Sequence, residues 1–91
     1  MMQYDWAFNK KAEKQFKKLD HTVQKRIIAW LNSNISGTTN PRIHGKALEG
    51  DLQTLWRYRV GKFRIIADIK DDKFIVAVIK VAKRGDVYLD H

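Results

Sequence analysis

Three arginines lie close together in the stretch LWRYRVGKFRII, on either side of a Gly61-Lys62 pair. If that pair forms a two-residue hairpin turn, Arg59 lies directly opposite Arg64, and Arg57 follows on the same face. Directly opposed side chains have Cβ atoms roughly 4.5–5.5 Å apart, so two guanidiniums there repel each other unless an anion lies between them. The arrangement indicates a phosphate-binding site, because a guanidinium offers phosphate a rigid fork of donors.

The alternative is that these arginines fan apart into water or pair with Asp68. The whole chain, however, carries a net charge of +8 and has a pI near 9.9. Such a charge points to a polyanionic partner, which could be nucleic acid, an anionic membrane surface or an acidic protein. Charge alone does not choose among the three.

The segments around these arginines show the periodicities of strands and helices. Residues 2–8 alternate like a half-buried strand, and Asn9 is suited to cap a helix that ends near residue 19. Asp20 is suited to cap a second helix, which ends at the Ser36-Gly37 pair. A connector over 38–51 leads to three strands at 54–60, 63–70 and 74–82, with Gly61-Lys62 and Asp71-Asp72 as two-residue connections.

This order predicts a single α+β domain over residues 1–91, with the succession β-α-α-β-β-β. We expect a small, antiparallel-dominated sheet with a hairpin of two helices packed on one face. Alternation places one set of residues on the core face: Trp56, Tyr58, Val60, Phe63, Ile65, Ala67 and Ile69. It leaves the three arginines and Asp68 on the opposite, partly open face.

The composition excludes several classes of site and of protein. Cysteine is absent, which excludes thiol catalysis and zinc fingers and favours a reducing cytoplasm. No apolar run approaches the roughly 18–20 residues that span a bilayer, so no membrane-spanning segment is expected. No carboxylate cluster or histidine pair has metal-ligand spacing, so the sequence offers no metal site, and no cofactor is expected. His44 lies in the connector without a partner motif and is interpreted as a surface residue.

The C-terminal segment VAKRGDVYLDH contains two further residues of interest. Arg84 follows the last predicted strand directly, and Tyr88 lies four residues beyond it. Tyr88 either folds back onto the core or stacks on an unpaired base, as aromatic side chains of single-stranded RNA binders do. The sequence leaves both interpretations open.

These features together resemble a known family. The hairpin motif W-R-x-R-V-G-x-[FY]-R at 56–64, the motif V-x-[KH]-R-x-x-V-Y at 81–88, and the passage from Lys46 through Leu48 and Gly50 to Trp56 resemble the RelE/ParE toxin superfamily. Within it they are most similar to the RelE-like mRNA interferases of type II toxin–antitoxin systems. The resemblance covers nearly the whole chain. It implies a ribosome-dependent endoribonuclease that cleaves mRNA in the A site by metal-independent attack of a 2′-hydroxyl.

The resemblance also implies roles for five catalytic residues. Arg57 and Arg59 match two basic positions on the strand before the turn. Arg64 matches the arginine that binds the scissile phosphate, and Arg84 matches the one near the leaving 5′-oxygen. Tyr88 matches a tyrosine that stacks on the substrate. An arginine is a poor general base, so the base stays unassigned, with Lys83 and Lys46 as accessory candidates.

The resemblance further implies an acidic, RelB-like antitoxin that forms a hetero-oligomer with the toxin. The other partners it implies are the 70S ribosome and its mRNA, in a bacterial or archaeal cytoplasm. Two alternatives stay open at this point. One is a ParE-like toxin that inhibits gyrase, and the other is a non-catalytic nucleic-acid-binding protein with the same fold.

Overall fold

The structure is a computed structural model that describes residues 2–48 and 55–83. Its elements, in chain order, are β1 (Asp5–Phe8), α1 (Lys10–Lys17), α2 (His21–Asn34), β2 (Lys46–Ala47), β3 (Leu55–Val60), β4 (Phe63–Lys70) and β5 (Ile75–Lys83). The predicted order is confirmed with one addition. The short strand β2 lies inside the segment that the sequence indicated as a connector, because two residues are too few to show an alternating pattern.

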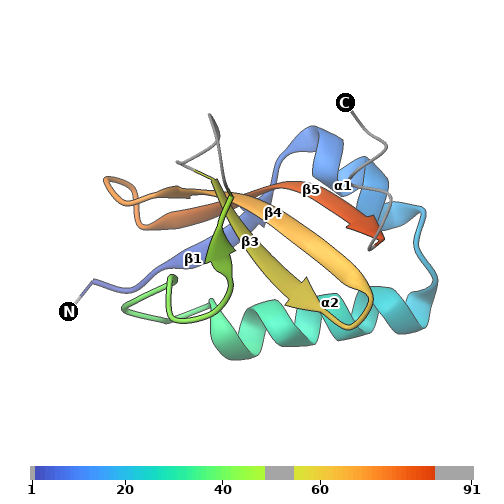
Figure 1. Cartoon of the computed structure of the whole chain (residues 1–91), viewed down its shortest axis with the longest axis horizontal. Coiled ribbons are helices and arrows are strands. Elements are labelled where there is room, and N and C mark those ends of the chain that lie inside the picture. The colour runs from blue at the N-terminus through green and yellow to red at the C-terminus, as the bar shows by residue number, and fades with distance from the viewer. Residues whose placement is uncertain (1, 49–54, 84–91) are drawn as a thin grey trace.

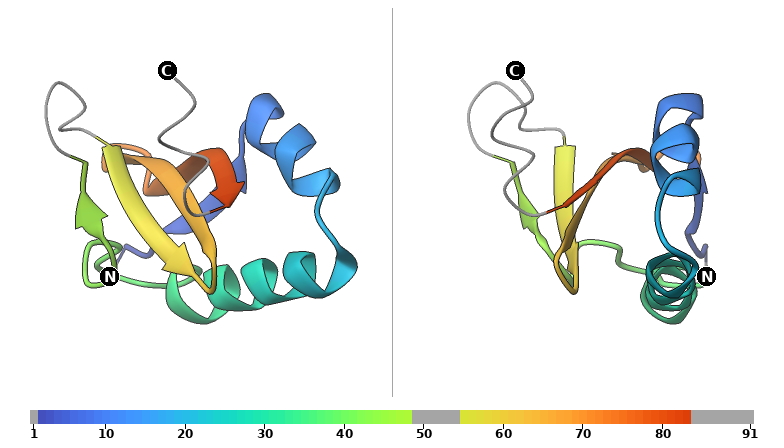
Figure 2. Two further views of the ribbon diagram at one scale, coloured as in Figure 1. Left: turned by 45° about the vertical axis from the view of Figure 1, so that its right-hand side comes forward. Right: turned by 90° about the vertical axis from the view of Figure 1, so that its right-hand side faces the viewer.

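The five strands form one sheet in the order β1-β5-β4-β3-β2 (Figure 1). β1 runs parallel to β5, and the other neighbouring strands are antiparallel. Figure 2 shows both helices on one side of this twisted sheet, with α1 against β5 and β1, and α2 against β3. The predicted α+β architecture is therefore confirmed, and neither of the two described helices covers the other face of the sheet.

Polar side chains cap α1 and connect its end to the start of α2. The side chain of Asn9 accepts a hydrogen bond of 2.8 Å from the backbone N–H of Ala12, which confirms the predicted N-cap of α1. Asp20 occupies the N-cap position of α2, but its side chain makes no capping hydrogen bond. The side chain of Gln24 instead donates to the carbonyl of Phe16 at 3.0 Å and ties the start of α2 to the end of α1.

The core lies between the sheet and the two helices. It combines Ile27, Leu31 and Ile35 from the α2 region with apolar side chains from the sheet, all fully buried or nearly so. The core face predicted for β3 and β4 is confirmed: Tyr58, Val60, Ile65, Ala67 and Ile69 are buried, and Trp56 and Phe63 are partly buried. No helix in the described ranges is both long enough and apolar enough to cross a membrane.

The hairpin that carries the arginines has the predicted register. Gly61 and Lys62 form its two-residue turn, and Gly61 has a φ of +59°, which suits a residue without a Cβ. Arg59 lies directly opposite Arg64. The second hairpin differs from the prediction, because four residues, 71–74, separate β4 from β5. Phe74 adopts a φ of +54° there and packs its ring edge-on against Tyr4, at a centroid distance of 5.3 Å.

A bulge interrupts β5 and changes which side chains face the helices. Ile66 pairs with Lys80 while Ala67 pairs with Val78, so Ile79 is an extra residue on β5. Beyond the bulge the alternation shifts by one residue. Val78 and Val81 can therefore both face the core, and Lys80 lies on the other face of the sheet, opposite Ile66.

Candidate functional site: a cationic face of the sheet

The face of the sheet away from the helices collects basic side chains in two rows across the strands. In the first row, Lys46 of β2 lies beside Arg57, which lies beside Ile66, which lies beside Lys80. Directly paired residues share a face, so the three cations of this row all belong to the face without helices.

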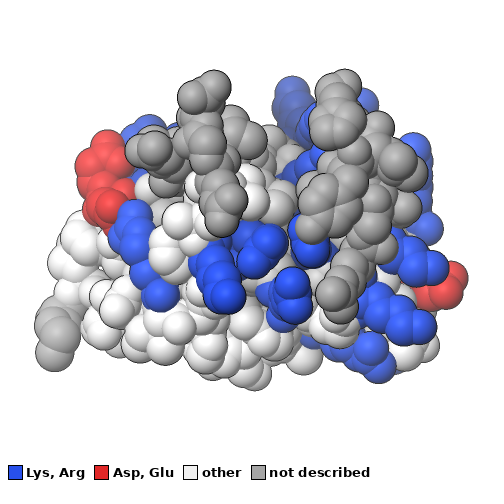
Figure 3. Space-filling model, in the orientation of Figure 1, with Lys and Arg blue, Asp and Glu red and all other residues white. Residues whose placement is uncertain are grey.

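The second row contains Arg59, Arg64 and Ala82. We call the five basic residues of the two rows the cationic face: Lys46, Arg57, Arg59, Arg64 and Lys80. Figure 3 looks onto this side of the molecule and shows lysines and arginines in a band across it, with acidic side chains at the two ends of the band.

The three hairpin arginines differ in exposure. Arg59 is exposed, Arg57 is half-buried, and Arg64 is only 6% exposed. Arg64 is the one buried charged residue in the part of the chain that the structure describes. A charge held away from water interacts strongly with another charge nearby, because less solvent screens the pair.

Asp68 is an acidic side chain on the same hairpin. The ion pair that the structure gives it is with Lys70, at 3.3 Å between Oδ2 and Nζ. Asp68 therefore does not form the ion pair with Arg57 or Arg59 that the sequence left open. The carboxylate of Asp68 thus does not offset the charges of Arg57 and Arg59.

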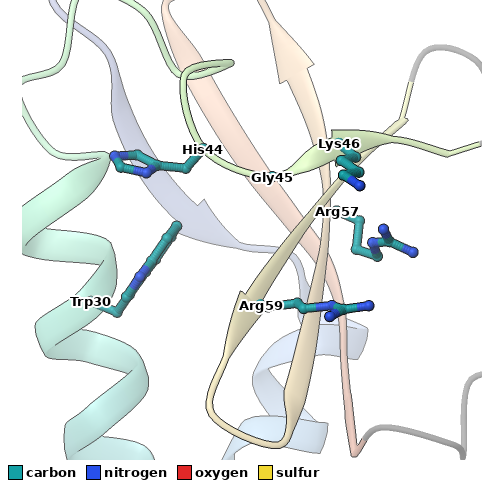
Figure 4. A pocket seen from close by; sticks show the side chains of 6 residues that line it. All are labelled: Trp30, His44, Gly45, Lys46, Arg57 and Arg59. Carbon is teal, nitrogen blue, oxygen red and sulfur yellow. The ribbon is translucent and has the colours of Figure 1, made fainter.

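A cleft of about 370 Å³ adjoins the cationic face, at the edge of the sheet next to α2. Its lining consists of Trp30, His44, Gly45, Lys46, Arg57 and Arg59. In Figure 4 the indole and the imidazole lie on the α2 side of β3, whereas the three cationic side chains extend away from α2. The cleft therefore joins an aromatic side to a cationic side.

Gly45 allows the cleft-lining loop to approach β3. Its φ is +79°, and a Cβ at this position would collide with the carbonyl oxygen of Arg57. A residue with a side chain would have to move the loop away from the strand. Gly45 therefore fixes where β2 begins and where the cleft lies.

Two hydrogen bonds from β3 hold the loop over 41–45. The indole N–H of Trp56 donates to the carbonyl of His44 at 2.6 Å, and the hydroxyl of Tyr58 donates to the carbonyl of Pro41 at 2.6 Å. Tyr58 is buried, and burial raises the pKa of its hydroxyl, so the proton that it donates is retained. Two aromatic side chains of β3 thus hold the loop against the sheet.

An ionic cluster holds the same loop from outside. The guanidinium of Arg42 donates to both carboxylate oxygens of Asp71 at 3.0 and 2.9 Å, and the hydroxyl of Tyr4 donates to Oδ1 at 2.6 Å. The hydrogen bonds from Arg42, and then from Tyr4, lower the pKa of the Asp71 carboxyl. We call Tyr4, Arg42 and Asp71 the carboxylate clamp.

The structure brings four of the candidate site residues together and separates one from them. Arg57, Arg59, Arg64 and Lys46 lie on the cationic face. Lys83 pairs with Phe63, which packs on the core, so Lys83 starts from the helix-facing side of the sheet. Arg84 and Tyr88 lie outside the described residues.

The sequence interpretation missed Lys80. Strict alternation from residue 74 onward would turn this lysine toward the helices, and only the bulge at Ile79 reverses that. One signal was available: Val78 and Val81 are both apolar at an odd spacing, which an uninterrupted strand would place on opposite faces. Within the described ranges, no group of three or more His, Cys, Asp or Glu side chains could hold a metal ion.

Comparison with known proteins shows which family the chain belongs to. Residues 7–88 match the family model described as the ParE toxin of the type II toxin–antitoxin system parDE. A protein of Escherichia coli described as RelE-like toxin is 32% identical, over 96% of this chain and 92% of its own.

Solved structures agree with this assignment. The crystal structure of the toxin–antitoxin complex RelBE2 from Mycobacterium tuberculosis matches with a TM-score of 0.81 and 23% identity, over 91% of this chain and 100% of the other. The intact E. coli RelBE toxin–antitoxin complex matches with a TM-score of 0.73 and 26% identity, over 90% and 98%. The first likeness concerns the fold alone. The chain belongs to the ParE toxin family within the RelE/ParE superfamily, and is a toxin of a type II toxin–antitoxin system.

Proposed function

We propose that this toxin is a ribosome-dependent endoribonuclease that cuts mRNA in the A site and so inhibits translation. The observation that carries the proposal is the directly opposed pair of Arg59 and Arg64, with Arg57 on the same face. Guanidiniums in register on one face of a hairpin present several N–H donors in the same direction. Such a donor set suits an anion such as the phosphate of RNA.

The chemistry needs no cofactor beyond the cations themselves. The 2′-oxygen of one nucleotide attacks its own 3′-phosphorus and loses its proton, and the bond from phosphorus to the 5′-oxygen of the next nucleotide breaks. The 5′-oxygen takes up a proton, which gives a 2′,3′-cyclic phosphate and a free 5′-hydroxyl. Negative charge builds on the phosphate oxygens during the attack, and guanidiniums placed beside them stabilise the transition state.

The roles divide along the two rows of the cationic face. Arg64 and Arg59 would hold the scissile phosphate, and Arg57 and Lys46 the adjoining one, with the flanking Lys80 adding to the positive field. By resemblance, Arg84 would stabilise charge on the leaving 5′-oxygen, and Tyr88 would stack on the substrate. Lys83 is a weaker candidate for the base, since its strand position faces the helices.

Mapping the 5′ ends of cellular mRNAs after induction tests the proposal. New ends inside translated codons that carry a 5′-hydroxyl are the expected result, and they should disappear when translation initiation on the message is blocked. Intact mRNA at growth arrest would contradict the proposal.

A second candidate function is inhibition of gyrase, and one observation favours it: the matching family model is the one described for ParE toxins. The same induction experiment separates the two. A gyrase inhibitor leaves mRNA intact and produces double-strand DNA breaks, whereas the ribonuclease leaves DNA intact. A non-catalytic nucleic-acid-binding protein would produce neither.

We also propose an acidic antitoxin as the partner of this chain. The net charge of +8 and the cationic face favour a negatively charged partner, and a related toxin is solved in complex with RelB. Such a partner would cover the hairpin arginines and neutralise the toxin. Co-expression with the adjacent open reading frame should restore growth and yield a co-purifying complex. Growth that stays arrested, with no companion protein, would contradict this pairing.

A further inference from the structure

We propose that the cleft beside the cationic face is a subsite for one nucleobase of the RNA, next to the phosphates that the arginines hold. This inference rests on the proposed function, since it takes RNA as the ligand. It adds a position at which the protein contacts a base rather than the sugar–phosphate backbone. Four features of the cleft suit a base: an aromatic wall, an uncovered backbone edge, a cationic side and a suitable size.

The aromatic wall comes from Trp30 and His44. Their rings meet edge to face at a centroid distance of 5.6 Å, and Trp30 also packs against Tyr58 at 5.2 Å. Tyr58 is fully buried, so the indole rests on a rigid support. His44 is exposed and lies at the outer end of this wall. Aromatic side chains held in this way are what proteins use to stack unpaired bases.

The backbone edge of β3 supplies polar groups beside this wall. The N–H of Leu48 donates to the carbonyl of Leu55 at 3.1 Å, so Leu55 directs its backbone groups toward β2. Alternate residues of a strand direct theirs to the same edge, which includes Arg57 and Arg59. β2 starts at Lys46, opposite Arg57, and therefore does not reach Arg59. An adjacent N–H and C=O at Arg59 match the adjacent acceptor and donor on a base edge.

The cationic side of the cleft lies where the phosphate of the same nucleotide would emerge. Lys46, Arg57 and Arg59 line the cleft and extend away from the aromatic wall (Figure 4).

The size of the cleft also suits a base. Its volume of about 370 Å³ lies at the lower end of the range for small-ligand sites. It is suited to one base with its ribose, and not to a stack of several.

A peptide strand added to the same edge is the competing ligand, and the structure disfavours it. Among the described residues of β3, Arg59 is the one on this edge that lies beyond the end of β2 and before the turn at Gly61. An added strand gains its affinity from several successive main-chain hydrogen bonds. One pair suffices for a base, whose remaining affinity comes from stacking and from the phosphate.

Binding of short oligonucleotides to the full-length protein, without ribosomes, tests the subsite. The probes are a 2′-O-methyl trinucleotide, which lacks the attacking hydroxyl, and three counterparts that each lack one base. For one of the three positions, we expect removal of the base to weaken binding at least about fivefold, the lower end for stacking on an aromatic side chain. Equal affinities for all four probes would overturn the proposal.

Two histidine variants locate the effect. His44→Ala removes the outer ring of the wall and keeps the carbonyl that binds Trp56, so the fold is retained. In this variant the affinity difference between the base-bearing and abasic probes should shrink about threefold or more. His21→Ala, at the exposed start of α2, is the matched control and should keep the full difference. An unchanged difference in His44→Ala would place the base elsewhere and overturn the proposal.

Two further outcomes separate this inference from its alternatives. A glutamate-rich peptide that competes with the probe, and whose own affinity falls in His44→Ala but not in His21→Ala, would assign the cleft to an acidic protein and overturn the base subsite. Because no ribosome is present, the result does not depend on cleavage. Base-dependent binding together with intact cellular mRNA would support the subsite and reject the proposed nuclease activity, and the reverse result would reject the subsite alone.

Discussion

Arg64 differs from the other hairpin arginines because its surroundings exclude water: it is 6% exposed, whereas Arg59 is exposed. A guanidinium that meets developing charge in such a place contributes roughly 3–4 kcal/mol, as single oxyanion-hole donors do. Arg64→Ala should therefore slow single-turnover cleavage by about a hundredfold or more on isolated translating ribosomes. Arg64→Lys keeps the charge without the fork and should lie in between. Cleavage by a folded Arg64→Ala protein at the wild-type rate would contradict the role of this residue.

Two lysines on β5 provide a matched pair for the charge argument. Lys80 lies on the cationic face and Lys83 starts on the other side of the sheet, although only three positions separate them. Each phosphate contact contributes about 0.7 to the slope of log affinity against log salt for a single strand. Lys80→Ala should reduce that slope by about this amount in binding to a 2′-O-methyl oligonucleotide, and Lys83→Ala should leave it unchanged. Equal slopes in the two variants would contradict the assignment of faces.

At the level of the elements, the β3–β4 hairpin could be predicted from the sequence and the β4–β5 hairpin only in part. Alternating residues and a Gly-Lys turn determine the register of the first, which places Arg59 opposite Arg64. The second depends on the packing of Phe74 against Tyr4 and on the bulge at Ile79. Both are tertiary effects, in which burial decides between local conformations of similar energy.

The same distinction holds for the candidate site. The arginines could be found because their type and spacing are local features of one hairpin. The cleft could not, since it needs Trp30 from α2, His44 from a loop and the early end of β2. The sequence favours a plain surface residue at His44 for this reason: His44 has no partner motif nearby, and the ring that it meets in the fold is fourteen positions away.

The contact of β3 with the cleft-lining loop gives a prediction about stability. Tyr58→Phe keeps the buried ring and removes the hydroxyl that binds Pro41, which leaves that carbonyl without its donor. The free energy of unfolding in urea should fall by about 1–2 kcal/mol, the cost of one lost buried hydrogen bond. Tyr4→Phe is the control, because its hydroxyl binds the partly exposed carboxylate of Asp71, and it should cost less. An equal or larger loss in Tyr4→Phe would mean that the outer contact holds the loop.

At the scale of the whole molecule, the carboxylate clamp connects three separate parts of the chain. It joins Tyr4 before β1, Arg42 in the cleft-lining loop, and Asp71 between β4 and β5. The two ionic partners are partly exposed, with side chains 41% and 55% accessible, so water screens their attraction. An ion pair of this kind contributes at most about 1 kcal/mol. Its effect should therefore be visible mainly in how stability depends on pH.

The direction of that dependence follows from the lowered pKa of the Asp71 carboxyl, which its hydrogen bonds with Arg42 and Tyr4 produce. A carboxyl whose pKa is lower in the folded than in the unfolded chain stabilises the fold fully above its ordinary value of 3.8, and loses this contribution as the pH falls through the folded value. Asp71→Asn should thus be less stable than the wild type at pH 7, by up to about 1 kcal/mol in urea unfolding. The difference should shrink as the pH falls below about 4, because the wild-type carboxyl then becomes neutral as well.

The control is Asp72→Asn, which removes a charge from the same loop and should show a smaller difference from the wild type at pH 7. If the difference between the wild type and Asp71→Asn were the same at pH 7 and pH 3, the clamp would owe its stability to shape and hydrogen bonding and not to the ionised carboxylate.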